Sequence, residues 1–114
     1  MSQFDGKETD IAEVVEKAIK DVTEICQIDR ALLMGRKRSE NVAVARFFLY
    51  TILRNEEFNW SHIGKITGRD HGAVMAGVRR LEGRLICGEK LLGMVRFNLL
   101  RRGWKFDKKF YYDY

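Results

Sequence analysis

The sequence contains no proline and only two cysteines among its 114 residues. Because proline breaks the interior of a helix, its absence favours a chain that is helical almost throughout. The cysteines, Cys26 and Cys87, lie within helical patterns and are too few for a disulfide framework. We therefore expect buried, reduced thiols and a cytoplasmic protein.

Long apolar stretches are also missing. No run of about 18 apolar residues occurs, so the sequence predicts no transmembrane helix and no membrane partner. The first ten residues are polar and acidic, unlike a secretory signal. With 46% hydrophobic and 32% charged residues, the chain matches a single globular domain.

Residues that suit catalysis or metal binding are scarce as well. The sequence has no P-loop and no pair of carboxylates at a catalytic spacing. Its two histidines, His62 and His71, and its two cysteines do not have the spacing of metal ligands. We therefore predict no enzyme activity, no catalytic residue, no metal, no cofactor and no small-molecule substrate.

Positive charge is distributed unevenly along the chain. Residues 1–34 carry 4 basic and 8 acidic side chains, whereas residues 35–114 carry 17 basic and 8 acidic side chains. A basic C-terminal part suits contact with nucleic-acid phosphates. A solvated basic face would give the same pattern, so charge alone does not decide the function.

Apolar residues recur at helical spacing through the first half of the chain. They predict a first helix that starts at Asp10 with capping-box spacing. A short second helix is predicted between its N-cap Asp29 and a stop at Gly35. A third helix over residues 40–55, capped by Ser39, is apolar over most of its circumference. We expect this helix to be the central, buried one.

Residues 59–82 have the pattern of a helix-turn-helix. Gly68 permits a tight turn, and Asp70 is placed to cap the following helix. One side of that helix carries apolar residues, namely Val74, Val78, Leu81 and Leu85. A neighbouring row is small near the helix start and basic further on: Gly72, Ala76 and Arg80. This shape suits insertion of the helix into a DNA major groove.

A last helix is predicted from near Glu89 to about residue 102. Its expected buried residues are Leu91, Leu92, Val95 and Leu99, with Met94 as a further candidate. The whole pattern predicts one all-α domain, a compact bundle of about six helices. Its parts would be a leader (1–8), a helical core (10–102) with the helix-turn-helix at about 60–86, and an aromatic, basic tail (103–114).

The sequence GRDHGAV, residues 68–74, resembles the signature of the C-terminal DNA-binding domain of the bacterial replication initiator DnaA. The resemblance extends from about residue 11 to about residue 100 and implies that domain's Trp-repressor-like fold. Gly72 and Ala73 stand where the family usually has threonines, and the ATPase domain of the initiator is absent. The amides of both residues would remain free to meet a phosphate. We do not carry over the family's DnaA box as the target.

The resemblance implies two modes of DNA contact. At the start of the recognition helix, it implies base contacts by Arg69, Asp70, His71 and Gly72. The basic loop, residues 36–38, would send Arg38 into the minor groove. Phosphate contacts would come from Lys37, Arg46, Arg54, Lys65, Ala73, Arg79 and Arg80, with Arg84 in reserve.

Each of these roles has a simpler alternative. Asp70 serves equally well as an N-cap, and His71 as an exposed residue at a helix start. Arg46 and Arg54 can extend from the core helix to water. The basic loop can be an ordinary solvated loop.

The tail, residues 104–114, contains six aromatics interleaved with lysines. It can pack on the protein, stack on exposed bases or dock on a partner. Taken together, the sequence predicts selective binding to duplex DNA on the nucleoid, with a role in replication or transcription in a bacterium or phage. One alternative is a protein-interaction module that uses residues 104–114. RNA binding is weaker, because the A-form major groove is deep.

Overall fold

The computed structural model describes residues 8–107, and these residues form six helices and no strand. The helices are α1 (Glu8–Cys26), α2 (Arg30–Met34), α3 (Glu40–Asn55), α4 (Trp60–Thr67), α5 (His71–Ile86) and α6 (Lys90–Arg101). The predicted all-α bundle of about six helices is therefore confirmed.

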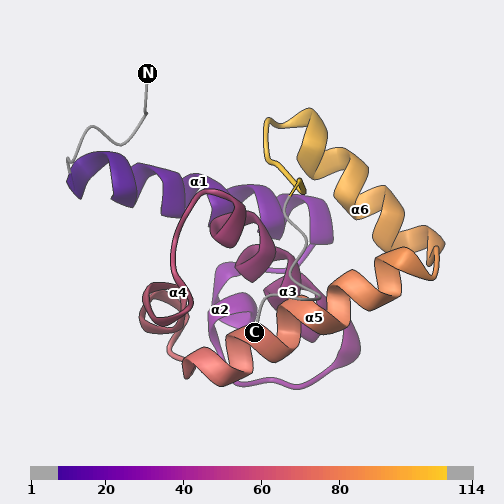
Figure 1. Cartoon of the computed structure of the whole chain (residues 1–114), viewed down its shortest axis with the longest axis horizontal. Coiled ribbons are helices and arrows are strands. Elements are labelled where there is room, and N and C mark those ends of the chain that lie inside the picture. Colours follow the sequence, from indigo (N-terminus) through magenta and orange to yellow (C-terminus); the bar gives the residue numbers. More distant parts are fainter. Residues whose placement is uncertain (1–7, 108–114) are drawn as a thin grey trace.

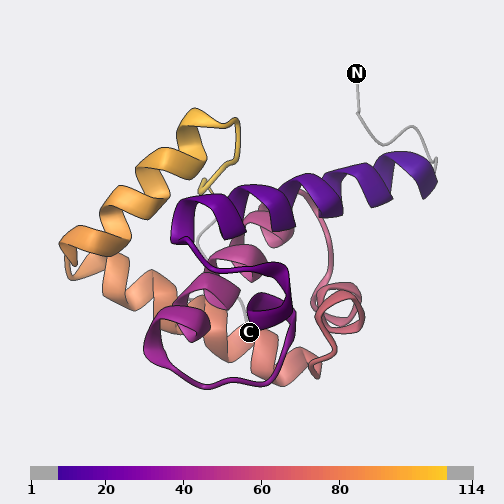
Figure 2. The ribbon, with the colours of Figure 1, turned by 180° about the vertical axis from the view of Figure 1, so that it is seen from behind.

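Helix α3 lies at the centre of the bundle, as its apolar circumference predicted. It packs against α1, α2, α4 and α5, which surround it in Figure 1. Phe48, Ile52 and Leu53 on this helix have no exposed surface. Seen from behind in Figure 2, α1 runs along the opposite side of the bundle from α5. The core therefore fixes α5 from one side only and leaves its other side to solvent.

The predicted helix starts are correct in part. Asp29 caps α2, since its Oδ1 accepts from the Leu32 amide at 2.8 Å. Ser39 occupies the N-cap position of α3 but makes no side-chain cap hydrogen bond. The predicted start of α1 at Asp10 was wrong, because the helix begins at Glu8 and Asp10 lies inside it. Apolar spacing marks the face of a helix but does not fix its first turn.

The predicted burial on α6 is also correct only in part. Leu92 and Leu99 are buried and Val95 is half-buried. Leu91 and Met94 are instead 74% and 56% exposed. The helix carries apolar residues around most of its circumference but packs mainly against α1 and α5. The sequence pattern therefore could not choose which apolar side faces the core.

The cysteines differ in environment. Cys26 is half-buried, and burial raises the pKa of its thiol to about 11. Cys87 is exposed at the end of α5, so the prediction that it is buried was wrong. Within residues 8–107, no three potential metal ligands gather at one place. Among the same residues, no helix has the length and apolar content that a membrane span requires.

The first two aromatics of the predicted tail pack on the protein. Trp104 is 5% exposed, and the ring of Phe106 meets that of Phe48 edge to face, with centroids 6.1 Å apart. For these two residues the packing alternative is confirmed. The other four aromatics, within residues 108–114, lie outside the described part of the chain.

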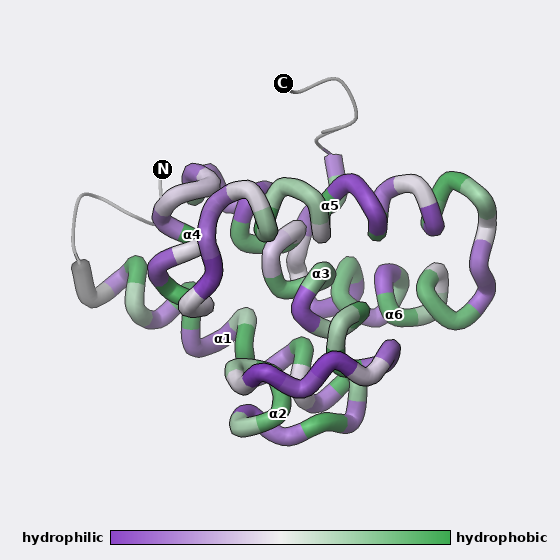
Figure 3. Tube along the Cα trace, turned by 90° about the horizontal axis from the view of Figure 1, so that it is seen from below, coloured by the Kyte–Doolittle hydropathy of each residue, from purple (hydrophilic) through white to green (hydrophobic). Residues whose placement is uncertain are grey.

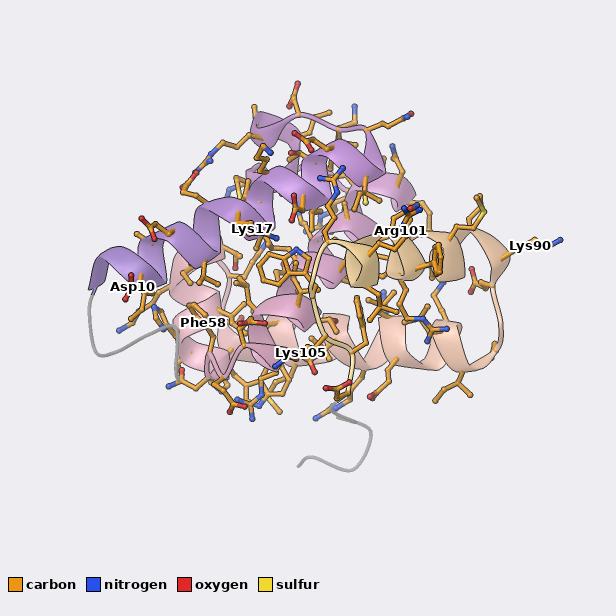
Figure 4. The ribbon with its side chains drawn as sticks, turned by 90° about the horizontal axis from the view of Figure 1, so that it is seen from above. Asp10, Lys17, Phe58, Lys90, Arg101 and Lys105 are labelled. Carbon is orange, nitrogen blue, oxygen red and sulfur yellow. The ribbon has the colours of Figure 1, made fainter. Side chains whose placement is uncertain are left out.

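A buried carboxylate on α1 holds the segment that follows α6. Asp21 is 4% exposed, and its Oδ2 accepts hydrogen bonds from Lys17 Nζ and Trp104 Nε1, both at 2.8 Å. Its Oδ1 accepts from Arg102 at 2.8 Å. Burial by itself raises the pKa of the Asp21 carboxyl, but these hydrogen bonds outweigh burial and lower the pKa. Figure 4 shows Lys17 on α1 beside this segment.

Candidate nucleic-acid interface

The helix-turn-helix is formed by α4, a short turn and α5. Asn59 caps α4 by accepting from the His62 amide at 2.8 Å. The helix ends at Gly68, which has a φ of 71°, as predicted for the turn. This left-handed conformation is strained for residues with a β-carbon. The carbonyl of Gly64 accepts from the amides of both Gly68 and Arg69 and so closes the turn.

Gly64 is a second glycine on which this turn depends. A β-carbon at this position would lie 2.5 Å from the backbone oxygen of Arg69. A backbone atom cannot move aside as a flexible side chain can, so any other residue would push α4 away from the turn. Sequence reasoning did not assign a role to Gly64, because helical spacing says nothing about backbone contacts across a turn.

The start of α5 is exposed and is capped as predicted. Asp70 Oδ1 accepts from the Ala73 amide at 2.9 Å, which confirms Asp70 as the N-cap. His71, Gly72 and Ala73 are all exposed at this end. The Ala73 amide is already occupied by Asp70, so the prediction that it is free for a phosphate was wrong. Base contacts by Asp70, His71 and Gly72 remain predictions.

The two sides of α5 are those that the sequence predicted. Val74, Val78 and Leu81 are buried, and Leu85 is half-buried against the core. The second row faces solvent, since Gly72, Ala76 and Arg80 are all exposed. Helix α5 therefore presents a surface that is small near its start and basic further along.

One close contact brings α5 near α3. A β-carbon at the buried Gly77 would lie 2.6 Å from Phe47 Cδ1 and 3.1 Å from Tyr50 Cδ2. The missing side chain lets α5 lie directly on α3. The spacing of apolar side chains on α5 did not predict this contact, because glycine has no side chain to contribute to the pattern.

Arg46 on α3 holds the connection between α2 and α3, instead of facing a phosphate. Its side chain is buried, with 7% of the residue exposed. The guanidinium donates to four carbonyl oxygens, those of Leu32, Leu33, Gly35 and Lys37. Burial lowers the pKa of Arg46, and the nearby charge of Arg69 lowers it further. With four of its five N–H groups engaged inside the protein, Arg46 is a structural residue. Its prediction as a phosphate contact was wrong.

Arg69 connects the same loop to the helix-turn-helix. Its guanidinium donates to the carbonyl oxygen of Gly35, and its charge lies close enough to Tyr50 to favour the ionised phenol. Burial raises the pKa of Tyr50, and the neighbouring guanidinium groups partly offset that rise. Arg69 is half-buried and points to the loop, so the prediction that it contacts a base is not supported. The sequence identified Arg69 as part of a motif, but it could not predict a contact with a loop 34 residues away.

The basic loop itself is exposed. Arg36, Lys37 and Arg38 all face solvent and form the strongly hydrophilic stretch beside α2 in Figure 3. Its backbone is held at Gly35 by Arg69 and at Lys37 by Arg46. The three cations are therefore carried on an anchored backbone next to the turn that precedes α5.

The remaining predicted cations have differing environments. Lys65 and Arg80 are exposed, and Arg79 is half-buried. Arg54 is half-buried, donates to the Phe58 carbonyl at 3.1 Å and lies 4.8 Å above the Trp60 ring. The reserve residue Arg84 is engaged in ion pairs with Glu40 and Glu89, each at 2.7 Å. These pairs raise the pKa of Arg84, and a phosphate contact would require Arg84 to leave its carboxylate partners.

The comparisons with known proteins bear on this geometry. The family model described as bacterial dnaA protein helix-turn-helix matches residues 15–81. Neither the comparison with curated proteins nor that with solved structures gave a match. The matched segment contains the basic loop, α4, the turn and most of α5, and it spans more than half of the chain. A helix-turn-helix of this family is a DNA-binding domain, with duplex DNA as its partner. The chain therefore belongs to the bacterial DnaA helix-turn-helix family.

Proposed function

We propose that this protein selects particular duplex DNA sequences, with α5 in the major groove and the loop 36–38 in the minor groove. The observation that carries the proposal is the shared anchor at Gly35. Both Arg46 and Arg69 donate to its carbonyl oxygen. That anchor places an exposed basic loop beside the exposed start of α5. Two separate reading elements then have a fixed relative position.

The major-groove contacts would come from the exposed start of α5. His71 can donate to guanine or accept from an amino group, and Asp70 can accept from the amino group of cytosine. The small residues Gly72 and Ala76 let the helix backbone approach the base edges. Asp70 continues to cap α5 through one oxygen, which leaves its other oxygen for a base.

The minor-groove contact would come from Arg38. A planar guanidinium suits a narrow minor groove, where the negative potential is enhanced. Lys37 lies beside Arg38 in the loop and would contact a phosphate. Both side chains are exposed, whereas the loop backbone is fixed from within the protein.

The other phosphate contacts would come from Lys65, Arg79 and Arg80, with Arg54 contributing at the edge of α3. Each contact that neutralises a phosphate releases counterions, which makes binding depend on salt. Together with Lys37, these five contacts predict a slope of about −4.5 in a plot of log affinity against log salt.

The biological role we propose is regulation at a replication origin or a promoter on the nucleoid of a bacterium or phage. We propose that the chain itself has no enzymatic activity, including no ATPase activity. It would act by occupying a DNA site at the origin or promoter. The shared family and the absence of a P-loop in this sequence support this role.

The experiment that tests this function is selection from a random duplex library. The selected DNA is then titrated against a scrambled duplex at low and at high salt. A defined motif with steep salt dependence supports the proposal. Binding without a motif would mean that the protein binds DNA only by electrostatic attraction, without sequence selectivity. No binding would favour the alternative of a protein-interaction module, although burial of Trp104 and Phe106 already removes two of the aromatics available to it.

A further inference from the structure

Large apolar side chains are exposed at the end of α5 and along α6. The exposed fractions are Ile86 62%, Leu91 74%, Met94 56%, Phe97 59% and Leu100 44%. They lie outside the family match, which ends at residue 81. Isolated exposed leucines are common on proteins, but a gathered apolar surface usually marks an interaction site.

Part of this surface is hollowed into a groove of about 570 Å³ between α5 and α6. We call it the α6 groove and define it by Leu85, Lys90, Gly93, Met94, Arg96 and Phe97. Most of its lining surface is apolar, and three charged residues, Glu89, Lys90 and Arg96, also line it. A hollow of this kind fits a convex partner, such as a helix, better than it fits a flat bilayer surface.

Gly93 forms an opening in the first turn of α6. A β-carbon added there would meet nothing within 4 Å, so no contact inside the described protein requires a glycine. Glycine is also a poorer helix former than alanine. The missing side chain instead lets another backbone approach the groove closely. The stability of the folded chain therefore does not explain a glycine at position 93, whereas a bound partner would.

The groove lining carries more positive than negative charge, with Lys90 and Arg96 against Glu89. Helix α6 has the sequence KLLGMVRFNLLR, with three basic residues and no acid. Lys90 projects away from the body of the protein in Figure 4. The neighbouring Glu89 is already paired with Arg84 at 2.7 Å. An antiparallel pair of α6 helices would place Lys90 of one copy near Arg101 of the other, which opposes a dimer through this face.

We propose that the α6 groove binds an acidic amphipathic helix of a partner protein. The apolar side of that helix would fill the groove against Met94 and Phe97. Its carboxylates would meet Lys90, Arg96 and Arg101 at the edges. Buried apolar anchors supply most of the affinity in such a complex, and the charges set its orientation.

This site is separate from the proposed DNA surface. His71 and Ile86 are at opposite ends of α5, which at 1.5 Å per residue places them about 22 Å apart. Figure 1 shows α6 beside the C-terminal half of α5 and away from α4. The protein can therefore hold DNA and the partner helix at the same time, and the proposal does not rest on DNA binding.

The test uses a fluorescent synthetic peptide of about the length of α6. It carries leucine or phenylalanine at positions i, i+3, i+4 and i+7 and glutamate at most others. We expect the full chain to bind this peptide, with amide shifts in the NMR spectrum confined to residues 85–101. A peptide with lysine in place of glutamate should not bind. Equal binding of both peptides would overturn the charge argument.

Two variants of the protein locate the site. Gly93→Leu fills the groove where a side chain has open space, so we expect an unchanged fold and about tenfold weaker peptide binding. Arg80→Gln, on the exposed row of α5 that belongs to the proposed DNA surface, should leave peptide binding unchanged. If Arg80→Gln weakens the peptide and Gly93→Leu does not, the acidic peptide is bound by the DNA surface and the proposal fails.

Other occupants of the groove are separate outcomes. Binding to vesicles of phosphatidylcholine and phosphatidylglycerol that Gly93→Leu does not impair, without peptide binding, would identify a lipid surface. Dimers in sedimentation that Phe97→Glu dissociates would identify a second copy. If removal of residues 108–114 exposes the groove to the peptide for the first time, the chain's own tail is the occupant. Each of these results would overturn the proposal of a partner helix.

Discussion

The Arg69 guanidinium donates to the carbonyl oxygen of Gly35, 34 residues earlier in the chain. Arg46 donates to the same oxygen, so the turn, the basic loop and the core helix α3 share one anchor. Buried hydrogen bonds from charged donors contribute more than neutral ones. The position of the loop relative to α5 is therefore already fixed in the free protein, before DNA binds.

The first prediction concerns this anchor. In Arg69→Leu the bond to Gly35 is lost, and the loop 36–38 should become mobile on the nanosecond timescale. We expect its backbone order parameters in the free protein to fall below the rigid value of about 0.85, while Arg46 still holds Gly35 and Lys37. Arg38→Leu, on the exposed side of the same loop, is the matched control and should leave them unchanged. Unchanged order parameters in Arg69→Leu would contradict the anchor.

The second prediction concerns Arg46. Arg46→Met preserves much of the volume but leaves buried carbonyl groups without donors. We expect a loss of about 3 kcal/mol in the free energy of unfolding, measured by urea denaturation, because each unsatisfied buried group costs about 1–3 kcal/mol. Arg80→Met, which removes an exposed cation, should change stability by no more than about 0.5 kcal/mol. Equal stability of the two variants would mean that Arg46 is not structural.

The third prediction separates base reading from phosphate contact. His71→Ala should cost about 1–3 kcal/mol on the selected duplex and little on a scrambled one, because it removes a base contact. Arg80→Gln should weaken both duplexes alike and reduce the salt slope by about one. Fluorescence anisotropy at several salt concentrations measures both effects. A uniform loss in His71→Ala would remove histidine from the reading surface.

The fourth prediction concerns pH. The pKa of Asp21 is lowered in the folded protein, so its ion pairs stabilise the fold above its unfolded pKa of about 3.9. This stabilisation should be lost as the pH falls through the folded pKa. At pH 7, Asp21→Asn should cost about 2 kcal/mol, a moderate value because Lys17 and Arg102 can return to water.

Urea denaturation at neutral and at acid pH tests this prediction. The stability difference between the wild type and Asp21→Asn should shrink at about pH 3. Glu24→Gln is the matched control, since Glu24 pairs with the same Arg102 but is exposed. It should have little effect at either pH. A pH-independent difference in Asp21→Asn would contradict the role of the carboxylate charge.

The sequence predicted those features that depend on local spacing. The buried and exposed sides of α5 follow from a period of about 3.6 residues, and Asp70 is the cap because its side chain acts three residues away. Arg46 could not be predicted, because its acceptors lie on α2 and the following loop. A lone arginine on an apolar helix has the same pattern whether it reaches water or four carbonyls. Leu91 was misplaced because α6 is apolar on more than one side.

The last prediction concerns the two positions that depart from the family pattern, Gly72 and Ala73. The double variant Gly72→Thr, Ala73→Thr restores hydroxyl and methyl groups at the start of α5. We expect its affinity for a DnaA-box duplex to rise by about 1–3 kcal/mol, roughly 5- to 150-fold, because these groups can contact base edges. A β-carbon at position 72 would lie 3.1 Å from Asp70 Oδ1, so the cap must shift slightly.

The matched control is Gly72→Val, Ala73→Val, which has the same branched shape but no hydroxyl groups. Thermal unfolding of both variants reports any damage to the Asp70 cap, which should be shared. If only the threonine variant gains affinity for the DnaA box, the hydroxyls carry the family's preference and their loss has changed what this protein reads. If both gain equally, side-chain volume is responsible. If neither gains, the target is set elsewhere, and the loop residue Arg38 becomes the first position to vary.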